Sequence, residues 1–368
     1  MQIRAAVLER FAEPLVVQDV DLAAPRAGEV LVRLKACGIC HTDMYSASGV
    51  DPSGYAPCVL GHEGAGIVEE VGDGVTSLAP GDHVVTLFSP QCGECVNCRS
   101  GKTNICVAIR EQQNAGYLPD GTARLSRNGE PVRHFMGCST FAEATVVSEI
   151  SLAKVSPDAP FEAAALFACG LSTGLGAAMY RAQVEPGSTC VVFGAGMVGL
   201  GAVAGCRLQG AERIICVDLS EERLNLAKRH GATDTWQAGD DVVDRVLQET
   251  GGYGADFTFE ATGLVGVMRQ AVESARIGWG TCCVTGVAGK GETLDIVPRY
   301  LITGRKVMGA SFGGVKGREQ VPLLVDRYLA GDIDAESFVS HRLTLDDVNH
   351  GFELMHHQDG IRSVMTFS

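Results

Sequence analysis

Aromatic residues and runs of basic residues are scarce in this sequence of 368 residues. Aromatic side chains make up 6% of the chain, and the formal net charge is −14 with an isoelectric point near 5.1. A protein with this excess of negative charge repels phosphate backbones and anionic membrane surfaces. We therefore expect neither a nucleic acid nor a membrane as a partner.

Long apolar segments are also missing. No stretch approaches the ~20 uninterrupted apolar residues that a transmembrane helix needs, and residues Met1–Ala5 lack the pattern of a signal peptide. We expect a cytoplasmic protein, and the cytoplasm keeps thiols reduced. The 14 cysteines therefore indicate free thiols and metal ligands rather than disulfides.

Glycine, by contrast, is abundant, with 46 residues, and the chain is longer than a single core usually supports. Residues 3–35 alternate apolar and polar positions between Pro and Gly, which predicts strands and turns. From Phe161 to Ala182 the pattern becomes helical and alanine-rich. We expect an α/β protein with a mainly β first part and a second domain that begins near this helical segment.

The residues with the clearest metal-binding character are Cys40 and His62, each close to a carboxylate, Asp43 and Glu63. Zinc accepts sulfur and nitrogen donors, and a carboxylate beside them can fix the orientation of an imidazole. Two ligands do not hold a metal tightly, so a third is expected. Cys169 is our candidate because it lies in a short apolar segment that ends in glycine; a buried structural cysteine is the alternative.

A second set of cysteines lies in the segment from Cys92 to Cys106, which has polar residues and no hydrophobic periodicity. Four thiols at these intervals can complete a tetrahedral shell, which is typical of a structural zinc. The alternatives are a disulfide pair and an iron–sulfur cluster. The four expected ligands are Cys92, Cys95, Cys98 and Cys106.

A glycine-rich turn, Gly194–Gly199 (GAGMVG), follows a short apolar run and opens an apolar helix through Leu208. A second strand follows and ends in Asp218. This context makes the motif a dinucleotide-binding fingerprint. The glycines Gly194, Gly196 and Gly199 allow close approach of a pyrophosphate to the helix N-terminus, with Val198 in the same turn.

Asp218 can accept hydrogen bonds from both ribose hydroxyls and would repel a 2′-phosphate, so NAD is favoured over NADP. Arg223, five residues further on, would weaken that preference. Asp218 could instead cap a helix. The strand that runs towards Val287 is expected to end at the same sheet edge, where nucleotides bind.

Together these motifs resemble the zinc-dependent medium-chain alcohol dehydrogenases over essentially the whole chain. The class III branch, the glutathione-dependent formaldehyde dehydrogenases, shares Gly61–Gly66, Pro90–Cys95, Phe312–Gly314 and Gly360–Ser363. The resemblance implies a Rossmann doubly wound parallel sheet for residues 171–311. It implies a mainly β, GroES-like catalytic domain for residues 1–170 and 312–368.

By resemblance, Cys40, His62 and Cys169 hold a catalytic zinc, the known Cys₂His set of alcohol dehydrogenases, and the other four cysteines hold a structural zinc. Thr42 matches the hydroxyl that passes on the alcohol proton, and Asp43 and Glu63 support the metal ligands. The implied cofactor contacts are His41 and Arg362 for the pyrophosphate and Arg223 for the adenosine ribose.

Near the substrate, the resemblance places Asp51 and Arg110 where class III proteins bind a glutathione adduct. Tyr45 stands where many relatives carry a relay histidine. Three residues depart from the class III pattern, because Gln, Glu and Lys are replaced by Val107, Ser53 and Ile277 respectively. These changes favour an apolar or aromatic alcohol, or an adduct of another thiol.

We therefore expect a zinc- and NAD-dependent dehydrogenase that interconverts primary alcohols and aldehydes by hydride transfer. The first alternative is an S-(hydroxymethyl)glutathione or other thiol-adduct dehydrogenase. A non-catalytic nucleotide-binding protein and a zinc-free quinone or enoyl reductase are further alternatives. Residues 107–135 are expected to form a long polar connection, similar to that of dimeric relatives, so we expect a homodimer.

Overall fold

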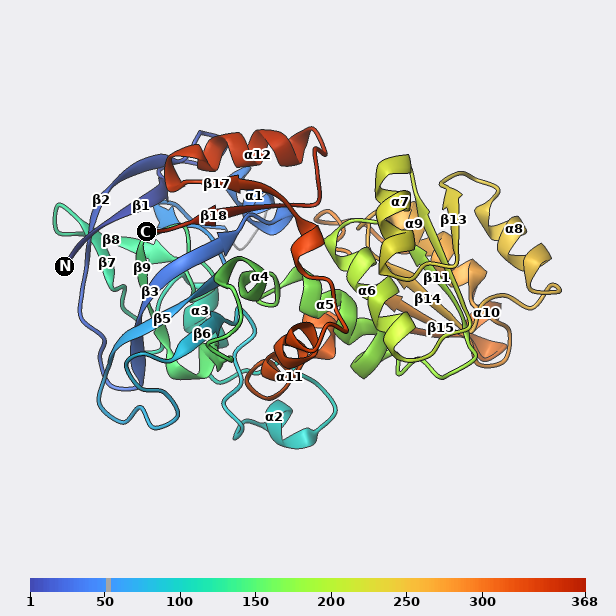
Figure 1. Ribbon diagram of the computed structural model, residues 1–368, viewed down its shortest axis with the longest axis horizontal. Coiled ribbons are helices and arrows are strands. Elements are labelled where there is room, and N and C mark those ends of the chain that lie inside the picture. Colours follow the sequence, from blue (N-terminus) through green and yellow to red (C-terminus); the bar gives the residue numbers. More distant parts are fainter. Residues whose placement is uncertain (51–53) are drawn as a thin grey trace. The chain divides into compact units, whose positions relative to one another are not determined.

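The structure is a computed structural model that describes residues 1–50 and 54–368. The chain forms two compact units, which are coloured along the sequence in Figure 1. Unit 1 comprises Met1–Cys169 and Lys316–Ser368, and unit 2 comprises Gly170–Val315. The predicted α/β class, with a mainly β part and a Rossmann part, is confirmed.

Unit 1 contains a closed barrel of five short strands. The barrel order is β1 (Gln2–Leu8), β2 (Val16–Leu22), β7 (Leu125–Arg127), β8 (Glu130–His134) and β4 (Cys58–Val59). Ile3, Val7 and Val20 belong to one buried apolar cluster and are at most 2% exposed. The barrel strands therefore contribute to the main apolar core of unit 1.

A second, seven-stranded sheet in unit 1 joins the two ends of the chain. Its order is β10 (Leu152–Lys154), β6 (His83–Thr86), β5 (Glu63–Val71), β3 (Glu29–Gly38), β18 (Arg362–Thr366) and β17 (Val339–Leu343), and β9 (Ala144–Ser148) also pairs with β3. Because β3 pairs with both β5 and β18, the residues that follow β3 and precede β5 lie close to the start of β18.

The helices of unit 1 are short, apart from two near the C-terminus. They are α1 (His41–Ala47), α2 (Val96–Ser100), α3 (Arg110–Asn114), α4 (Phe161–Leu166), α11 (Gly317–Leu329) and α12 (Val348–His356), with 3₁₀ turns at Glu149–Ser151, Glu336–Phe338 and Leu345–Asp347. Helix α11 is the longest of these, with 13 residues.

The prediction of a long polar connection over residues 107–135 is wrong. This segment contains α3 and the strands β7 and β8, which complete the barrel. The strands form a hairpin around Asn128 and Gly129, which have φ values of 52° and 82°. An Asn-Gly pair is a strong hairpin signal, but the flanking strands are too short and polar for their alternation to be evident. Tertiary pairing with β2 and β4 stabilises them.

Unit 2 is a six-stranded, fully parallel sheet. Its order is β13 (Asp234–Gln237), β12 (Arg213–Asp218), β11 (Thr189–Phe193), β14 (Phe257–Glu260), β15 (Thr281–Val284) and β16 (Lys306–Gly309). In chain order this is the 3-2-1-4-5-6 arrangement of a dinucleotide-binding fold, whose order reverses between β11 and β14. Right-handed crossovers place helices on both faces of such a sheet.

The connecting segments of unit 2 are mainly helical. They include α5 (Gly170–Gly176), a π-helical turn (Ala177–Arg181), α6 (Met197–Leu208), α7 (Glu221–His230), α8 (Val242–Glu249), α9 (Val265–Ser274), α10 (Arg299–Ile302) and a 3₁₀ turn (Ser311–Gly314). Helix α6 follows β11 after a turn of three residues, which aims the N-terminus of α6 at the carboxyl edge of the sheet.

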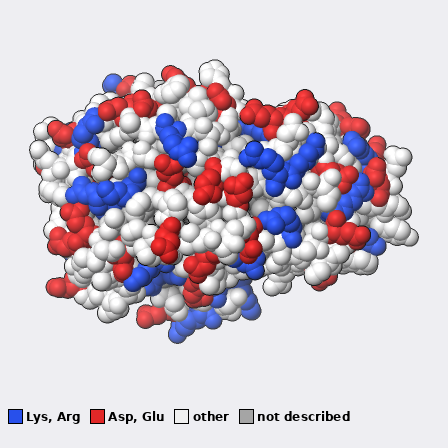
Figure 2. Space-filling view, in the orientation of Figure 1, with Lys and Arg blue, Asp and Glu red and all other residues white. Residues whose placement is uncertain are grey.

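In residues 1–50 and 54–368, every helix is too short or too polar to span a bilayer. Figure 2 shows acidic and basic side chains interspersed over the viewed face of the molecule.

Candidate metal centres and cofactor site

The first candidate metal centre is assembled in unit 1 from three distant parts of the chain. Cys40 follows β3 and caps α1, His62 directly precedes β5, and Cys169 lies in the turn after α4. One sulfur or nitrogen atom of each, and one carboxylate oxygen of Glu63, lie within 4.8 Å of one another. Cys40 and His62 are buried, with 8% and 1% exposure. The donors are therefore already close enough to share one ion.

Asp43 fixes the geometry of this centre. Its Oδ1 lies 2.9 Å from Nδ1 of His62 and accepts a hydrogen bond from the backbone N–H of Gly61, while Oδ2 accepts the N–H of Cys40 at 2.9 Å. A carboxylate can only accept, so Nδ1 of His62 carries the proton and Nε2 is left as the donor atom. Asp43 thereby orients the imidazole.

Electrostatics in this centre favour the anionic form of one sulfur, that of Cys40. A hydrogen bond from the Cys169 thiol lowers the pKa of Cys40 well below its usual range, against the opposing effect of burial. The same contact raises the pKa of Cys169 well above its usual range. Burial alone would lower the pKa of His62, but the Asp43 carboxylate and the Cys40 thiolate raise it well above the usual value.

A carboxylate oxygen of Glu63 lies among the sulfur and nitrogen atoms that would bind the metal, whereas the sequence indicated only a supporting role for this residue. Burial raises its pKa to about 7, opposed by the guanidinium of Arg362, whose Nη2 lies 3.1 Å from Oε1 of Glu63. Arg362 is 6% exposed and also donates from Nη1 to the carbonyl of Ile39 at 2.6 Å. Arg362 is thus paired with Glu63 within unit 1. The predicted contact of Arg362 with the cofactor pyrophosphate stays a prediction.

The remaining residues predicted for this region lie on or beside α1. The Oγ1 of Thr42 is 3.7 Å from the Cys40 sulfur, so its hydroxyl is adjacent to the donor set. His41 is exposed on the first turn of α1, and Tyr45 is half-buried on the same helix. Asp51 and Ser53 lie outside the described residues.

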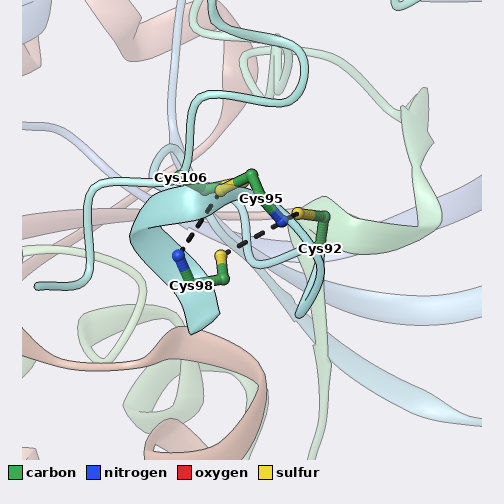
Figure 3. A group of neighbouring side chains, drawn as sticks. All are labelled: Cys92, Cys95, Cys98 and Cys106. Carbon is green, nitrogen blue, oxygen red and sulfur yellow. Dashed lines mark hydrogen bonds between the residues drawn. The ribbon is translucent and has the colours of Figure 1, made fainter. Parts of the chain in front are cut away.

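The second candidate metal centre is local. The side chains of Cys92, Cys95, Cys98 and Cys106 converge on one another (Figure 3). Their sulfurs lie within 4.8 Å of one another. The sulfur pairs Cys92–Cys98 and Cys95–Cys106 are each 3.9 Å apart. These distances suit four ligands around one ion and are too long for disulfide bonds.

Backbone N–H groups support thiolate character in this second centre. The N–H of Cys95 donates to the Cys92 sulfur at 3.2 Å, and the N–H of Cys98 donates to the Cys95 sulfur at 3.4 Å. Backbone hydrogen bonds of this kind, from Val107 and Cys98, lower the pKa of Cys95 to about 6. In contrast, burial raises the pKa of Cys106 to about 12.

Both donor sets fit zinc. Four thiols give the closed shell of a structural site, and two thiols with one imidazole give the three-ligand set of a catalytic site. Within residues 1–50 and 54–368, only these two groups of side chains could hold a metal ion in this way. Cys40, His62 and Cys169 would hold one zinc, and the four clustered cysteines would hold the other.

The candidate cofactor site lies at the carboxyl edge of the parallel sheet in unit 2. Gly194 has φ +95°, and Gly196 faces open space, since a Cβ there would meet nothing within 4 Å. Gly199 packs directly on the carbonyl of Gly194. The turn therefore exposes backbone on one side and packs tightly on the other, as a pyrophosphate-binding turn must.

Asp218 is held at the end of β12, facing this turn. Its Oδ2 accepts the N–H of Ala195 at 2.6 Å, and Oδ1 accepts the N–H of Ser220 at 2.8 Å. Ser220, rather than Asp218, caps α7 by accepting the N–H of Arg223. Asp218 therefore does not serve as the helix cap that was an alternative explanation for it.

Two regions of the chain match family models. Residues 26–157 match the alcohol dehydrogenase GroES-like domain, and residues 197–330 match the zinc-binding dehydrogenase domain. The chain is also 50% identical over its whole length to the S-(hydroxymethyl)glutathione dehydrogenase of Escherichia coli O139:H28, which it covers completely.

The chain belongs to the zinc-binding alcohol dehydrogenase family.

Solved structures of this family are similar along the entire chain. An alcohol dehydrogenase zinc-binding domain protein from Burkholderia ambifaria has a TM-score of 0.94 and 34% identity, covering 100% of this chain and 99% of that chain. The benzyl alcohol dehydrogenase of Acinetobacter calcoaceticus has a TM-score of 0.93 and 32% identity, covering both chains completely. The predicted reaction class of the enzyme, alcohol dehydrogenation, is thus confirmed.

Several residues that this dehydrogenase was predicted to use for substrate or cofactor recognition are exposed or half-buried in their units. Arg110 begins α3 with an exposed side chain. Val107 is 42% exposed in unit 1, and Ile277 is 47% exposed in unit 2. Val287 is 77% exposed after β15, and Val198 is half-buried in the first turn of α6. Their contacts with substrate or cofactor stay predictions.

Glu260 was not predicted from the sequence as a residue of the cofactor site. It is the last residue of β14 and is fully buried at the same sheet edge as the glycine turn. A signal was present, because Glu260 is an acidic residue at the end of an otherwise apolar strand and precedes Thr262 and Gly263. A buried acid in such a strand requires specific hydrogen-bond donors.

Proposed function

We propose that this dehydrogenase oxidises apolar or aromatic primary alcohols to aldehydes with NAD, and catalyses the reverse reaction. The observation that carries the proposal is the convergence of Cys40, His62 and Cys169 on one point in unit 1. Three protein ligands leave a fourth position of a tetrahedral zinc for a substrate oxygen. The reaction class itself follows from the family.

A bound zinc would supply a Lewis acid that lowers the pKa of an alcohol hydroxyl, and NAD would supply the hydride acceptor. The chain's own residues then hold the geometry and move the proton. Asp43 keeps the imidazole of His62 in one tautomer, and the hydroxyl of Thr42, beside Cys40, takes up the alcohol proton and passes it on. Tyr45 offers no imidazole, so the proton would leave through the ribose and water.

The preference for NAD over NADP is assigned to Asp218. Its carboxylate already holds the glycine turn through Ala195, and a 2′-phosphate next to it would be repelled. Replacing Asp218 with Ser should therefore raise kcat/KM with NADP relative to NAD. Arg223 to Ala is the matched control, because it removes the nearby cation and should lower NADP use. An unchanged cofactor ratio in the Asp218 variant would contradict this assignment.

A second candidate substrate is S-(hydroxymethyl)glutathione. The identity of 50% to proteins with that activity and the exposed guanidinium of Arg110 favour it. Against it stand Val107 and Ile277, which offer no charge or hydrogen bond to a carboxylate where class III proteins have Gln and Lys. A polar adduct with two carboxylates would lose those contacts, whereas a benzylic or long-chain alcohol would not need them.

The discriminating experiment is an NAD-reduction assay with hydroxymethylglutathione, benzyl alcohol and a long-chain primary alcohol side by side. We expect higher kcat/KM with the apolar alcohols. In the double variant Val107→Gln and Ile277→Lys, kcat/KM for the glutathione adduct should rise at least about tenfold, the size of one or two regained polar contacts. A wild-type enzyme that prefers hydroxymethylglutathione would overturn the apolar assignment and leave the reaction class intact.

The organisation of the chain supports three further proposals. Residues 1–170 and 312–368 form the catalytic domain, and residues 171–311 form the NAD-binding domain. The enzyme acts in the cytoplasm, which is consistent with 14 free cysteines. It is a homodimer, as the resemblance to dimeric relatives suggests, and sedimentation should give twice the chain mass of 38.7 kDa.

A further inference from the structure

Glu260 is a buried carboxylate that organises the carboxyl edge of the sheet in unit 2. Its Oε1 accepts hydrogen bonds from the N–H and the hydroxyl of Thr262, both at 2.6 Å, and from the N–H of Gly263 at 2.9 Å. Its backbone carbonyl accepts the N–H and the hydroxyl of Thr285 at 2.9 and 2.6 Å. Glu260 therefore ties the turn after β14 to the turn after β15.

No cation balances this carboxylate within residues 1–50 and 54–368. Its Oε2 is buried without a hydrogen-bond partner, and none of the ion pairs among these residues includes it. The neighbour of Oε2 is Gly286, where a Cβ would lie 2.6 Å from that oxygen. Three donors on Oε1 match what an ionised carboxylate accepts. An uncompensated buried charge is costly to keep unless it serves a purpose.

The place of Glu260 in the sheet relates it to the cofactor. A dinucleotide lies across the point where the strand order reverses, here between β11 and β14. Asp218 marks the adenosine side at the end of β12, so the nicotinamide side is at the ends of β14 and β15. Both turns held by Glu260 are on that side.

The turns are packed tightly against the rest of the edge. A Cβ on Gly194 would lie 2.9 Å from the methyl group of Thr262, and a Cβ on Gly263 would lie 2.6 Å from the carbonyl oxygen of Val287. A change at Glu260 would therefore be transmitted to the glycine turn and to Val287, the residues predicted to contact the cofactor.

We propose that Glu260 is a positioning residue for the nicotinamide half of the cofactor, and that its uncompensated charge raises the affinity of this site for NAD⁺ relative to its affinity for NADH. The oxidised ring carries a positive charge that the reduced ring lacks. A fixed negative charge in a partly desolvated site attracts the first and not the second. The inference rests on the proposed function, namely that unit 2 binds NAD.

The test compares the dissociation constants of NAD⁺ and NADH for the zinc-loaded wild type and for Glu260→Gln. Glutamine keeps the size and the Oε1 acceptor but removes the charge. We expect the dissociation constant of NAD⁺ to rise on the order of tenfold, the effect of one charge interaction, while that of NADH changes less than about twofold. Calorimetry measures NAD⁺ binding, and nucleotide fluorescence measures NADH binding.

Two further variants separate charge from structure. Asp256→Asn is the matched control, because Asp256 directly precedes the same strand, at the end opposite to Glu260, where it accepts the N–H of Thr189 at 3.0 Å. It should leave the NAD⁺/NADH ratio unchanged. Glu260→Asp keeps the charge with a shorter reach, so both affinities should weaken while their ratio stays near the wild-type value.

If Glu260→Gln weakens the binding of NAD⁺ and NADH equally, the role of Glu260 is structural only and the proposal is overturned. The proposal is also overturned if Glu260→Asp changes the NAD⁺/NADH affinity ratio as much as Glu260→Gln does. An unchanged ratio in Glu260→Gln also overturns it. A wild-type protein that binds neither nucleotide would instead refute the proposed function on which the inference rests.

Discussion

Individual side chains in the first metal centre depend on one another for orientation. Asp43 contacts the imidazole of His62 and the backbone N–H of Cys40, so one carboxylate aligns two of the three zinc donors. Such partners of metal ligands are important for affinity, because they fix the tautomer and the direction of the donor atom. The three donors should therefore bind one zinc together and lose it together.

Replacing Cys40 or His62 with Ala should lower the zinc content from two ions per chain to one and abolish alcohol oxidation. The affinity for NAD should remain within about twofold, because the glycine turn belongs to unit 2 and has its own contacts. Elemental analysis, an activity assay and nucleotide titration check the three parts. Cys58→Ala is the control, since Cys58 is buried at 1% exposure outside both groups and should leave two zinc ions. Full activity in either ligand variant would refute the zinc mechanism.

At the scale of elements, the second metal centre is connected to α11. Gln91, next to Cys92, accepts the backbone N–H of Arg318 at 3.0 Å and donates to Glu319 at 2.5 Å. The guanidinium of Arg318 in turn donates to Ser77 at 2.7 Å. The loop that would hold the structural zinc is thus attached to the first turn of α11 through hydrogen bonds between Gln91 and residues Arg318 and Glu319.

We predict that Cys98→Ser removes the structural zinc and loosens both elements. Zinc content should fall to one ion per chain, and amides of residues 91–106 and of the first turn of α11 should exchange faster with solvent. Hydrogen-exchange mass spectrometry measures this change, with the amides of β11 in unit 2 as the internal reference. Unchanged protection around residue 318 would mean that α11 does not depend on the zinc loop.

At the scale of the whole molecule, the buried imidazole of His134 contributes to the pH dependence of the free energy of unfolding. His134, at the end of β8, is fully buried and accepts the N–H of Arg124 at Nε2 at 3.0 Å. Burial, together with the Arg124 guanidinium, lowers the pKa of His134 to about 3. In the unfolded chain the same imidazole has a pKa of about 6.5.

Because the unfolded state binds this proton more readily, the contribution of His134 to stability is fully present above pH about 6.5 and is lost progressively towards pH about 3. From pH 7 to pH 5 the loss is about 2 kcal/mol. His134→Gln keeps an acceptor without titrating, so its urea midpoint should fall less over this interval than that of the wild type. Other acid-sensitive groups are common to both proteins and cancel in the comparison. Parallel curves for the two proteins would contradict the assignment.

Several elements and one site were evident from short stretches of sequence. The strands β11, β12, β14 and β15 of unit 2 are mainly apolar runs, the glycine turn follows one of them, and the four cysteines lie close together in the sequence. In each case the residues that interact are close in the chain, so spacing alone carries the information. The hairpin of β7 and β8 was not evident, because its strands are stabilised by pairing with distant strands rather than by their own pattern.

The sequence by itself determined the α/β class, the Rossmann unit, the local four-cysteine centre and the family to which this dehydrogenase belongs. Only the tertiary structure decided that Cys169 lies beside Cys40 and His62, that Glu63 is paired with Arg362, and that Glu260 is buried with no ion-pair partner among the residues that the structure describes. The physical reason is distance along the chain. Contacts between remote segments depend on how the sheets and turns pack, and no local pattern of residues records that packing.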